Sequence, residues 1–170
     1  RPEWARPAWP AWEERVEEVA SVIRRERPDV VAMQEETPAM VELLLRNLDG
    51  YRYQTVPPDP QSASGLLVRK ERVAVLERAR VPLPFDRAVT LLRVKVDKQT
   101  CWVGSTHFTP FAERKAARTE SAAALAAWAW GMAEPVVVMG DFNSLPGDPA
   151  IGLLLREGFR DVFSPGEEGV

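Results

Sequence analysis

The amino-acid sequence predicts a single α/β domain over residues 1–170, layered around a mixed sheet or two sheets. Three observations predict this class. A helical pattern leads into a short apolar strand near the N-terminus, and a second helical pattern leads into another apolar strand near the C-terminus. Between them lies a β-rich block whose segments are separated by proline and charge, as in antiparallel sheets. Strands that are apolar on both faces are typical of sheets covered by helices.

The N-terminal unit begins with an amphipathic pattern. Residues 11–27 carry apolar side chains at helical spacing, with acidic residues in the first turn, and a proline follows. Residues 29–34 then predict a short buried strand, because the run Val30-Val31-Ala32-Met33 within them is apolar on both faces. Thr37 followed by Pro38 is a typical helix start, which predicts a second helix over residues 38–48.

The rest of the chain is assigned in the same way. Four β-rich stretches are expected, at residues 51–56, 65–77, 88–96 and 100–108. They precede a long alanine-rich helix, an apolar strand and a short helix, at residues 112–132, 135–139 and 149–158. No repeat or linker divides the chain, so we expect one domain.

Composition excludes several functions. The 22 basic and 25 acidic residues give a net charge of −3, which argues against sequence-independent binding to duplex DNA. A single cysteine, Cys101, and a single histidine, His107, exclude a disulfide framework and Cys- or His-rich metal sites. No apolar run is long enough for a membrane span. No signal peptide is visible, which favours the cytoplasm, although the chain begins with Arg1 rather than Met.

Two acidic segments are candidates for chemistry. Met33-Gln34-Glu35-Glu36 and Gly140-Asp141-Phe142-Asn143 each follow an apolar strand, and α/β proteins place ligand sites at the carboxyl ends of strands. Two converging carboxylates suit Mg²⁺, which takes one or two protein carboxylates and completes its shell with water and phosphate oxygens. Each segment also has a simpler interpretation: the first as the solvated end of a strand, the second as an Asx turn.

Other side chains leave alternatives open. His107 ends a strand and can face a cleft, although a lone histidine is more often structural. The basic residues at the start of the long helix form either a solvated face or, less often, a phosphate contact; they are Arg114, Lys115 and Arg118. The N-terminal tryptophans cover the edge of the core or form a binding platform; they are Trp4, Trp9 and Trp12.

Five segments, in order, carry a resemblance to a known family: Trp12-Glu13-Glu14-Arg15, Pro28-Asp29-Val30-Val31-Ala32-Met33-Gln34-Glu35, Thr106-His107-Phe108, Gly140-Asp141-Phe142-Asn143-Ser144-Leu145-Pro146 and Gly158-Phe159-Arg160-Asp161. Over residues 12–161 the chain resembles the endonuclease/exonuclease/phosphatase superfamily, which has the deoxyribonuclease I-like fold. The resemblance implies a four-layer α/β sandwich, two mixed β-sheets flanked by helices. It also implies Mg²⁺- or Mn²⁺-dependent hydrolysis of a phosphoester, usually a phosphodiester, in nucleic acid, lipid or a small molecule.

Matching positions imply residue roles. Glu35 would bind the metal ion. Asp141 would orient or deprotonate water, or help to protonate the leaving oxygen. Asn143 would hydrogen-bond a phosphate oxygen, and His107 would contact the scissile phosphate or assist proton transfer. Arg87 resembles, more loosely, an arginine that several members place near phosphate.

The sequence departs from the family at both ends. Members begin with a strand that ends in asparagine, and close with an R-I-D-like strand and an S-D-H motif whose aspartate and histidine form a catalytic pair. These elements are not found in residues 1–170, so we expect a partial domain that alone is weakly active or inactive. The alternative is a non-catalytic pseudoenzyme or binding domain on the same fold. Neither interpretation identifies a protein partner.

Overall fold

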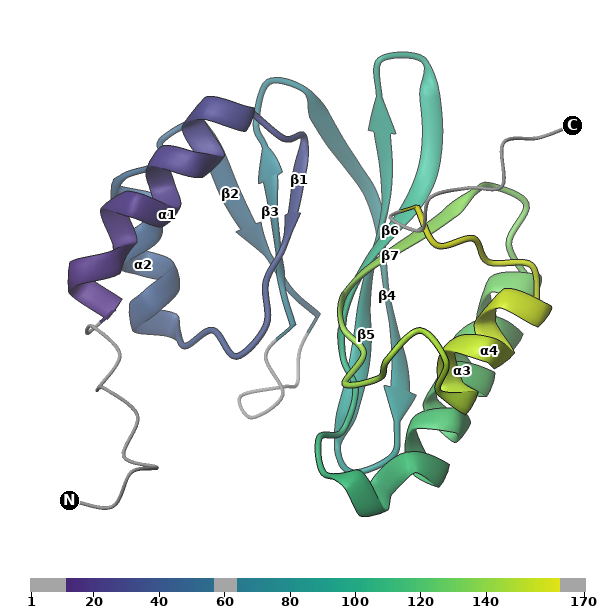
Figure 1. Ribbon diagram of the computed structural model, residues 1–170. Helices are drawn as coiled ribbons and strands as arrows, with labels where there is room; N and C mark the ends of the chain where they lie inside the picture. Colours follow the sequence, from purple (N-terminus) through teal and green to yellow (C-terminus); the bar gives the residue numbers. More distant parts are fainter. Residues whose placement is uncertain (1–11, 57–63, 163–170) are drawn as a thin grey trace, which may run out of the picture.

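The computed structural model describes residues 12–56 and 64–162, which form four layers (Figure 1). Two helices cover the outer face of one sheet, a second sheet packs against the first, and two further helices cover the second sheet. In chain order the elements are α1 (Trp12–Glu26), β1 (Val30–Ala32), α2 (Pro38–Arg46), β2 (Tyr51–Gln54), β3 (Leu66–Arg69), β4 (Val73–Leu83), β5 (Arg87–Val96), β6 (Gln99–His107), the 3₁₀ turn η1 (Ala112–Arg114), α3 (Lys115–Trp130), β7 (Val136–Asp141) and α4 (Pro149–Arg156).

The two sheets confirm the predicted fold class. The first has the strand order β1-β3-β2 and is antiparallel throughout. The second has the order β4-β5-β6-β7 and is mixed, because β6 and β7 run parallel and are joined through α3. Residues 65–77, expected as one stretch, divide into β3 and the start of β4. The turn between them carries the chain from one sheet to the other.

Three apolar clusters separate the layers. The first lies between the N-terminal helices and their sheet and includes Ala20, Leu44 and Leu67. The second lies between the sheets and includes Val68 and Leu92. The third lies between the second sheet and its helices; its buried members are Val81, Leu83, Val89, Leu91, Trp102, Phe108, Ala122, Leu125, Ala126, Ala150 and Leu154. Burial on both faces of each sheet provides the main stabilisation of such a sandwich.

The expectation that both apolar strands are buried is wrong. All three residues of β1 are only half-buried, and β7 consists of half-buried and exposed positions. The physical reason is their place in the sheets, since each is the outermost strand of its sheet in the described part of the chain. An outermost strand leaves one edge, and part of its side-chain surface, outside the core.

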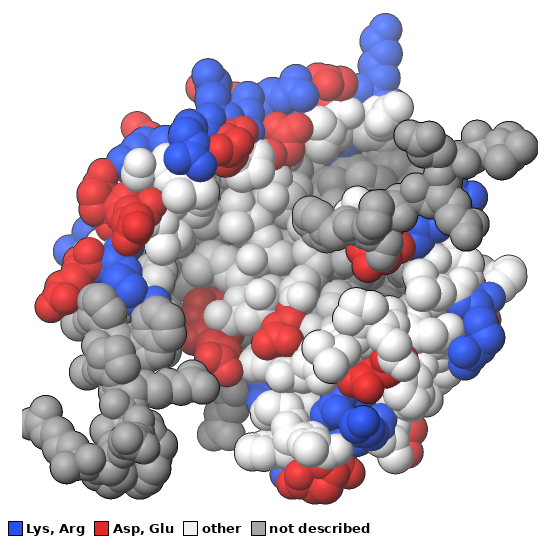
Figure 2. Space-filling view, viewed as in Figure 1, with Lys and Arg blue, Asp and Glu red and all other residues white. Residues whose placement is uncertain are grey.

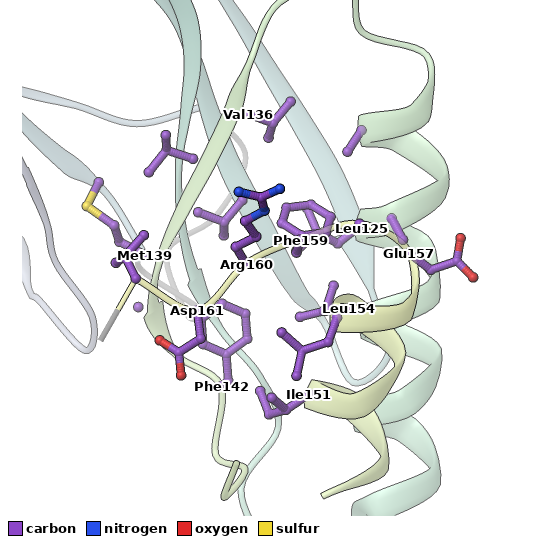
Figure 3. A pocket seen from close by; sticks show the side chains of 18 of the residues that line it. Leu125, Val136, Met139, Phe142, Ile151, Leu154, Glu157, Phe159, Arg160 and Asp161 are labelled. Atoms are coloured by element: carbon purple, nitrogen blue, oxygen red, sulfur yellow. The ribbon is translucent and has the colours of Figure 1, made fainter. Parts of the chain in front are cut away.

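A groove of about 910 Å³ runs along the outer side of β7, between this strand and the helices α3 and α4. Its walls are largely apolar, and Figure 3 shows Phe142, Leu154 and Phe159 converging between β7 and α4. Asp141 and Asn143 lie at one end of the groove. The groove is therefore a consequence of the open edge of β7 and reaches the end of the strand that carries the acidic motif.

The predicted helix cap at Thr37 and the predicted position of Trp12 agree with the structure. The Thr37 side chain caps α2 by accepting a hydrogen bond from the backbone N–H of Met40 at 3.2 Å. Trp12 donates its indole N–H to the Met40 carbonyl at 3.2 Å, which agrees with a role at the edge of the core. Trp4 and Trp9 lie outside the described residues. Within residues 12–56 and 64–162, no helix is long and apolar enough to cross a membrane.

Candidate active site

The parallel pairing of β6 and β7 builds the first half of the site. In this register His107 lies opposite Asp141, at the carboxyl ends of both strands. The backbone N–H of Phe108 donates to the Asp141 carbonyl at 2.8 Å, which continues the pairing past the end of β6. As a result, His107 Nε2 lies 3.9 Å from Asp141 Oδ2.

Glu35 reaches the same place from the other sheet. The buried Ser105 hydroxyl donates to the Met33 carbonyl at 3.0 Å and accepts from Gln34 Nε2 at 2.9 Å, so β6 is tied to the segment that follows β1. Glu35 then turns with a φ of 60°, a conformation that is uncommon outside glycine. Its Oε1 atom lies 3.9 Å from His107 Nε2. One imidazole nitrogen therefore faces two carboxylates from different sheets.

Arg87 determines how the histidine is oriented. Its Nη1 atom lies 3.2 Å from His107 Nδ1, on the opposite side of the ring from the carboxylates. A guanidinium can only donate, so Nδ1 accepts and we assign the imidazole hydrogen to Nε2. The buried ring thus presents an N–H donor toward the space between Glu35 and Asp141.

Asp141 is held by the turn that follows β7. The backbone N–H of Asn143 donates to Asp141 Oδ1 at 2.7 Å, the geometry of an Asx turn. Asn143 has a φ of 47° and donates through Nδ2 to the Phe108 carbonyl at 2.8 Å. One carboxylate oxygen of Asp141 is thereby fixed by the turn, while the other faces the histidine. The Asx turn that the sequence analysis offered as a simpler interpretation of this segment is therefore present, and it holds Asp141 in the site.

The carboxylates remain accessible although the histidine is buried. The Glu35 side chain is 79% exposed and that of Asp141 is 54% exposed. Figure 2 shows acidic side chains near the middle of this face, where the surface recedes between the two halves of the molecule. Among the described residues no group of three or more potential metal ligands is found. Two oxygen donors with room for water nevertheless fit Mg²⁺, which retains several waters.

All five predicted site residues are linked by these contacts. Glu35, His107 and Asp141 form the centre, Asn143 supports the aspartate, and Arg87 supports the histidine. The roles that the resemblance implies for them remain predictions, and Arg87 in particular is seen here as a support of the imidazole.

Arg118 was expected to lie on a solvated helix face, but it does not. Its side chain is buried, and Nη1 donates to the carbonyls of Thr109 and Phe111 at 3.2 and 2.8 Å. It fixes the backbone between β6 and α3. Of the three basic residues Arg114, Lys115 and Arg118, Lys115 is exposed and Arg114 is half-buried.

Glu36 belongs to the acidic segment that the sequence marked, but no supporting role was assigned to it. Its neighbour Glu35 points into solvent, but Glu36 is only 5% exposed. Oε1 of Glu36 accepts hydrogen bonds from the Tyr53 hydroxyl at 2.8 Å and from the Gly65 backbone N–H at 2.5 Å. These bonds anchor the segment after β1 to β2 and to the residue before β3, and so hold the backbone from which Glu35 extends.

We expect Tyr53→Phe to lower the free energy of unfolding by about 1–3 kcal/mol, because it leaves a buried carboxylate with one donor fewer. Tyr51→Phe is the matched comparison, since it removes a hydroxyl that donates to the neutral Pro28 carbonyl at 2.7 Å. Its expected loss is about 1 kcal/mol. Urea unfolding measures both, and equal losses would show that the Glu36 bond has no special anchoring role.

The sequence of this chain matches the profile of the Endonuclease/Exonuclease/phosphatase family over residues 8–169. The chain therefore belongs to that family. Among curated proteins, no sequence is significantly similar to it.

Solved structures show the same fold. TDP2 from D. rerio, crystallised with a single-strand DNA product, has a TM-score of 0.73 and 23% identity over 83% of this chain and 57% of its own. An endonuclease/exonuclease/phosphatase family protein from Bacteroides thetaiotaomicron has a TM-score of 0.76 and 18% identity, over 86% and 60%. A mannosyl-6-phosphatase from the same organism has a TM-score of 0.74 and 18% identity, over 86% and 63%. The chain thus spans about three fifths of the length of these structures.

Proposed function

We propose that this chain carries the active-site core of a phosphoester hydrolase that depends on Mg²⁺ or Mn²⁺, with a phosphodiester as substrate. The observation that carries the proposal is the convergence of Glu35 and Asp141 on His107 Nε2, each at 3.9 Å. Carboxylates that face one another across a polar, accessible site repel unless a cation or proton lies between them. Family membership supports the same chemistry.

The proposed roles follow from the hydrogen bonds. Glu35 binds the cation, which when present neutralises phosphate charge and so favours attack by water. Asp141 orients or deprotonates that water through Oδ2, since Oδ1 is already engaged by the Asn143 backbone N–H. His107 donates from Nε2 to a phosphate oxygen, while Arg87 holds its ring. Asn143 retains one amide hydrogen for a second phosphate oxygen after bonding the Phe108 carbonyl.

The similar structures support a phosphoester as the common element. One was solved with single-strand DNA product and another is named for a sugar phosphate, so their substrates differ in the group attached to phosphorus. A small substrate such as bis(p-nitrophenyl) phosphate is therefore the appropriate first test. It requires only the phosphate-handling residues that the site provides.

The test begins with metal binding. We expect Mg²⁺ to raise the melting temperature of the wild-type chain, because a ligand that binds only the folded state stabilises it. Glu35→Gln should abolish this shift. Glu42→Gln should retain it, since Glu42 is an exposed residue of α2 that pairs with Arg46 on the surface. Mg²⁺-dependent hydrolysis of bis(p-nitrophenyl) phosphate is then measured for all three chains.

Two results would contradict the proposal. If Glu35→Gln keeps the full Mg²⁺ shift, Glu35 is not the metal ligand. If Mg²⁺ binds through Glu35 but neither Mg²⁺ nor Mn²⁺ supports hydrolysis, the chain is better described as a binding domain on this fold.

A further inference from the structure

Two exposed phenylalanines enclose an arginine beside the candidate active site. Phe85 lies in the turn between β4 and β5, and Phe111 lies between β6 and α3; their exposed fractions are 55% and 59%. The guanidinium carbon of Arg114 lies 4.2 Å from the centroid of the Phe85 ring and 4.8 Å from that of Phe111. Cation–π attraction of this kind fixes the two rings relative to one another. We call these three residues the aromatic clamp.

The backbone of the clamp is unusual. Phe85 has a φ of 60°, its neighbour Asp86 a φ of 55°, and Phe111 a φ of 77°. Bulky side chains rarely adopt positive φ, and such strain persists only where the surrounding structure imposes it. Here buried Arg118 bonds the Phe111 carbonyl, and Arg114 donates to the Thr109 hydroxyl at 3.0 Å. The fold therefore holds two large apolar rings outward, in conformations that glycine would adopt without strain.

The clamp adjoins the phosphate-handling residues through both of its segments. Arg87, which contacts His107, is only two residues beyond Phe85. Phe111 is four residues beyond His107 itself. In Figure 1 the β4–β5 turn and the chain entering α3 lie at the same end of the second sheet, where β6 also ends. A group bound to the clamp would thus be attached close to a phosphate held at His107.

We propose that the aromatic clamp stacks an unpaired nucleobase of the substrate, so that the hydrolysed phosphodiester is part of a single-stranded nucleotide chain. The inference rests on the proposed function and specifies its substrate. Each ring has one face against the Arg114 guanidinium, and more than half of each phenylalanine is exposed. A planar ring with polar edges can stack on the exposed side of such a phenylalanine and accept hydrogen bonds from the arginine beside it. A lipid tail would instead require a continuous apolar surface.

The test compares two probes that differ only in their bases. A fluorescein-labelled short oligodeoxythymidylate and the abasic oligomer of equal length are titrated with the chain in EDTA, where metal-dependent cleavage does not interfere. We expect the wild type to bind the base-bearing probe at least about fivefold more tightly, the lower range of base–aromatic stacking. Phe85→Leu combined with Phe111→Leu should bind both probes equally. Trp130→Leu, an exposed aromatic at the far end of α3, should keep the preference.

A second pair of variants separates binding from folding. Phe85→Gly and Phe111→Gly should also lose the base preference, while their melting temperatures stay equal to that of the wild type or rise, because glycine relieves the positive φ. The proposal is overturned if the wild type shows no base preference, if the leucine double variant retains it, or if the glycine variants melt far below the wild type. A base preference without metal-dependent hydrolysis would contradict only the proposed phosphoesterase function, and hydrolysis without a base preference would contradict only the clamp.

Discussion

Asp141→Asn is expected to lower the rate of metal-dependent phosphodiester hydrolysis by about 10²–10⁴-fold, the range that a positioned general acid or base contributes. The amide oxygen of asparagine can still accept the Asn143 backbone N–H that now binds Asp141 Oδ1, so the turn is preserved. What the substitution removes is the negative charge facing His107 at 3.9 Å. The rate with bis(p-nitrophenyl) phosphate and saturating Mg²⁺ is the measurement.

Two further variants make this result interpretable. Asp141→Ala removes both the charge and the acceptor, and we expect it to abolish hydrolysis and to lower stability slightly. Asp148→Asn changes an acid near the same motif, but Asp148 accepts from the Leu145 N–H and pairs with Lys115 at the start of α3. Its rate should equal that of the wild type. Undiminished hydrolysis by either Asp141 variant would exclude this carboxylate from proton transfer and water activation.

The second-sheet half of the site was predictable from local sequence. Both His107 and Asp141 end apolar strands that flank one long helix, and parallel strands joined in this way meet at the same edge of a sheet. The positions of Asn143 and its turn also follow from the short Asp-Phe-Asn segment, because Asx turns form within a few residues. The residues that fix this turn are therefore close together in the sequence.

The sequence pattern marked the segment of Glu35 as a candidate, but only the family resemblance gave Glu35 its own role. Its approach to His107 depends on Ser105 bridging to Met33 and Gln34, residues about 70 positions away that belong to the other sheet. Nothing in the sequence pattern marks Ser105 as a bridging residue, since its neighbours in β6 are equally suited to a buried strand. Contacts between sheets depend on how the two layers pack, and periodicity within a strand carries no information about that packing.

Glu36 and the aromatic clamp could not be predicted for a related reason. Consecutive acids normally suggest a solvated segment, yet the turn at Glu35 sends one side chain into solvent and the next into a pocket formed by Tyr53 and Gly65. Phe85 and Phe111 are large apolar residues that the sequence analysis did not mark, and both are exposed. Their outward orientation is set by positive φ angles, and those angles become visible only in three dimensions.

Gly140→Ala is expected to lower the free energy of unfolding by about 3 kcal/mol or more, a large share of the roughly 5–15 kcal/mol of a typical domain. Gly140 has a φ of 138°, and a Cβ atom there would lie 2.1 Å from the Thr106 carbonyl oxygen. That oxygen belongs to the backbone of β6 directly opposite, so neither strand can yield without breaking the parallel pairing. Urea unfolding of the two chains provides the comparison.

Gly147→Ala is the matched control, because a Cβ atom at residue 147 would have no neighbour within 4 Å. We expect a change of about 0.5 kcal/mol or less for this variant. Should Gly140→Ala still fold, the added methyl group must push β7 away from β6, and the Asp141 carboxylate would move with it. The variant would then lose hydrolysis even under conditions where it is fully folded. Stability equal to that of the Gly147→Ala chain would show that the close approach of Gly140 to Thr106 is not required, and that the distance between His107 and Asp141 is set elsewhere.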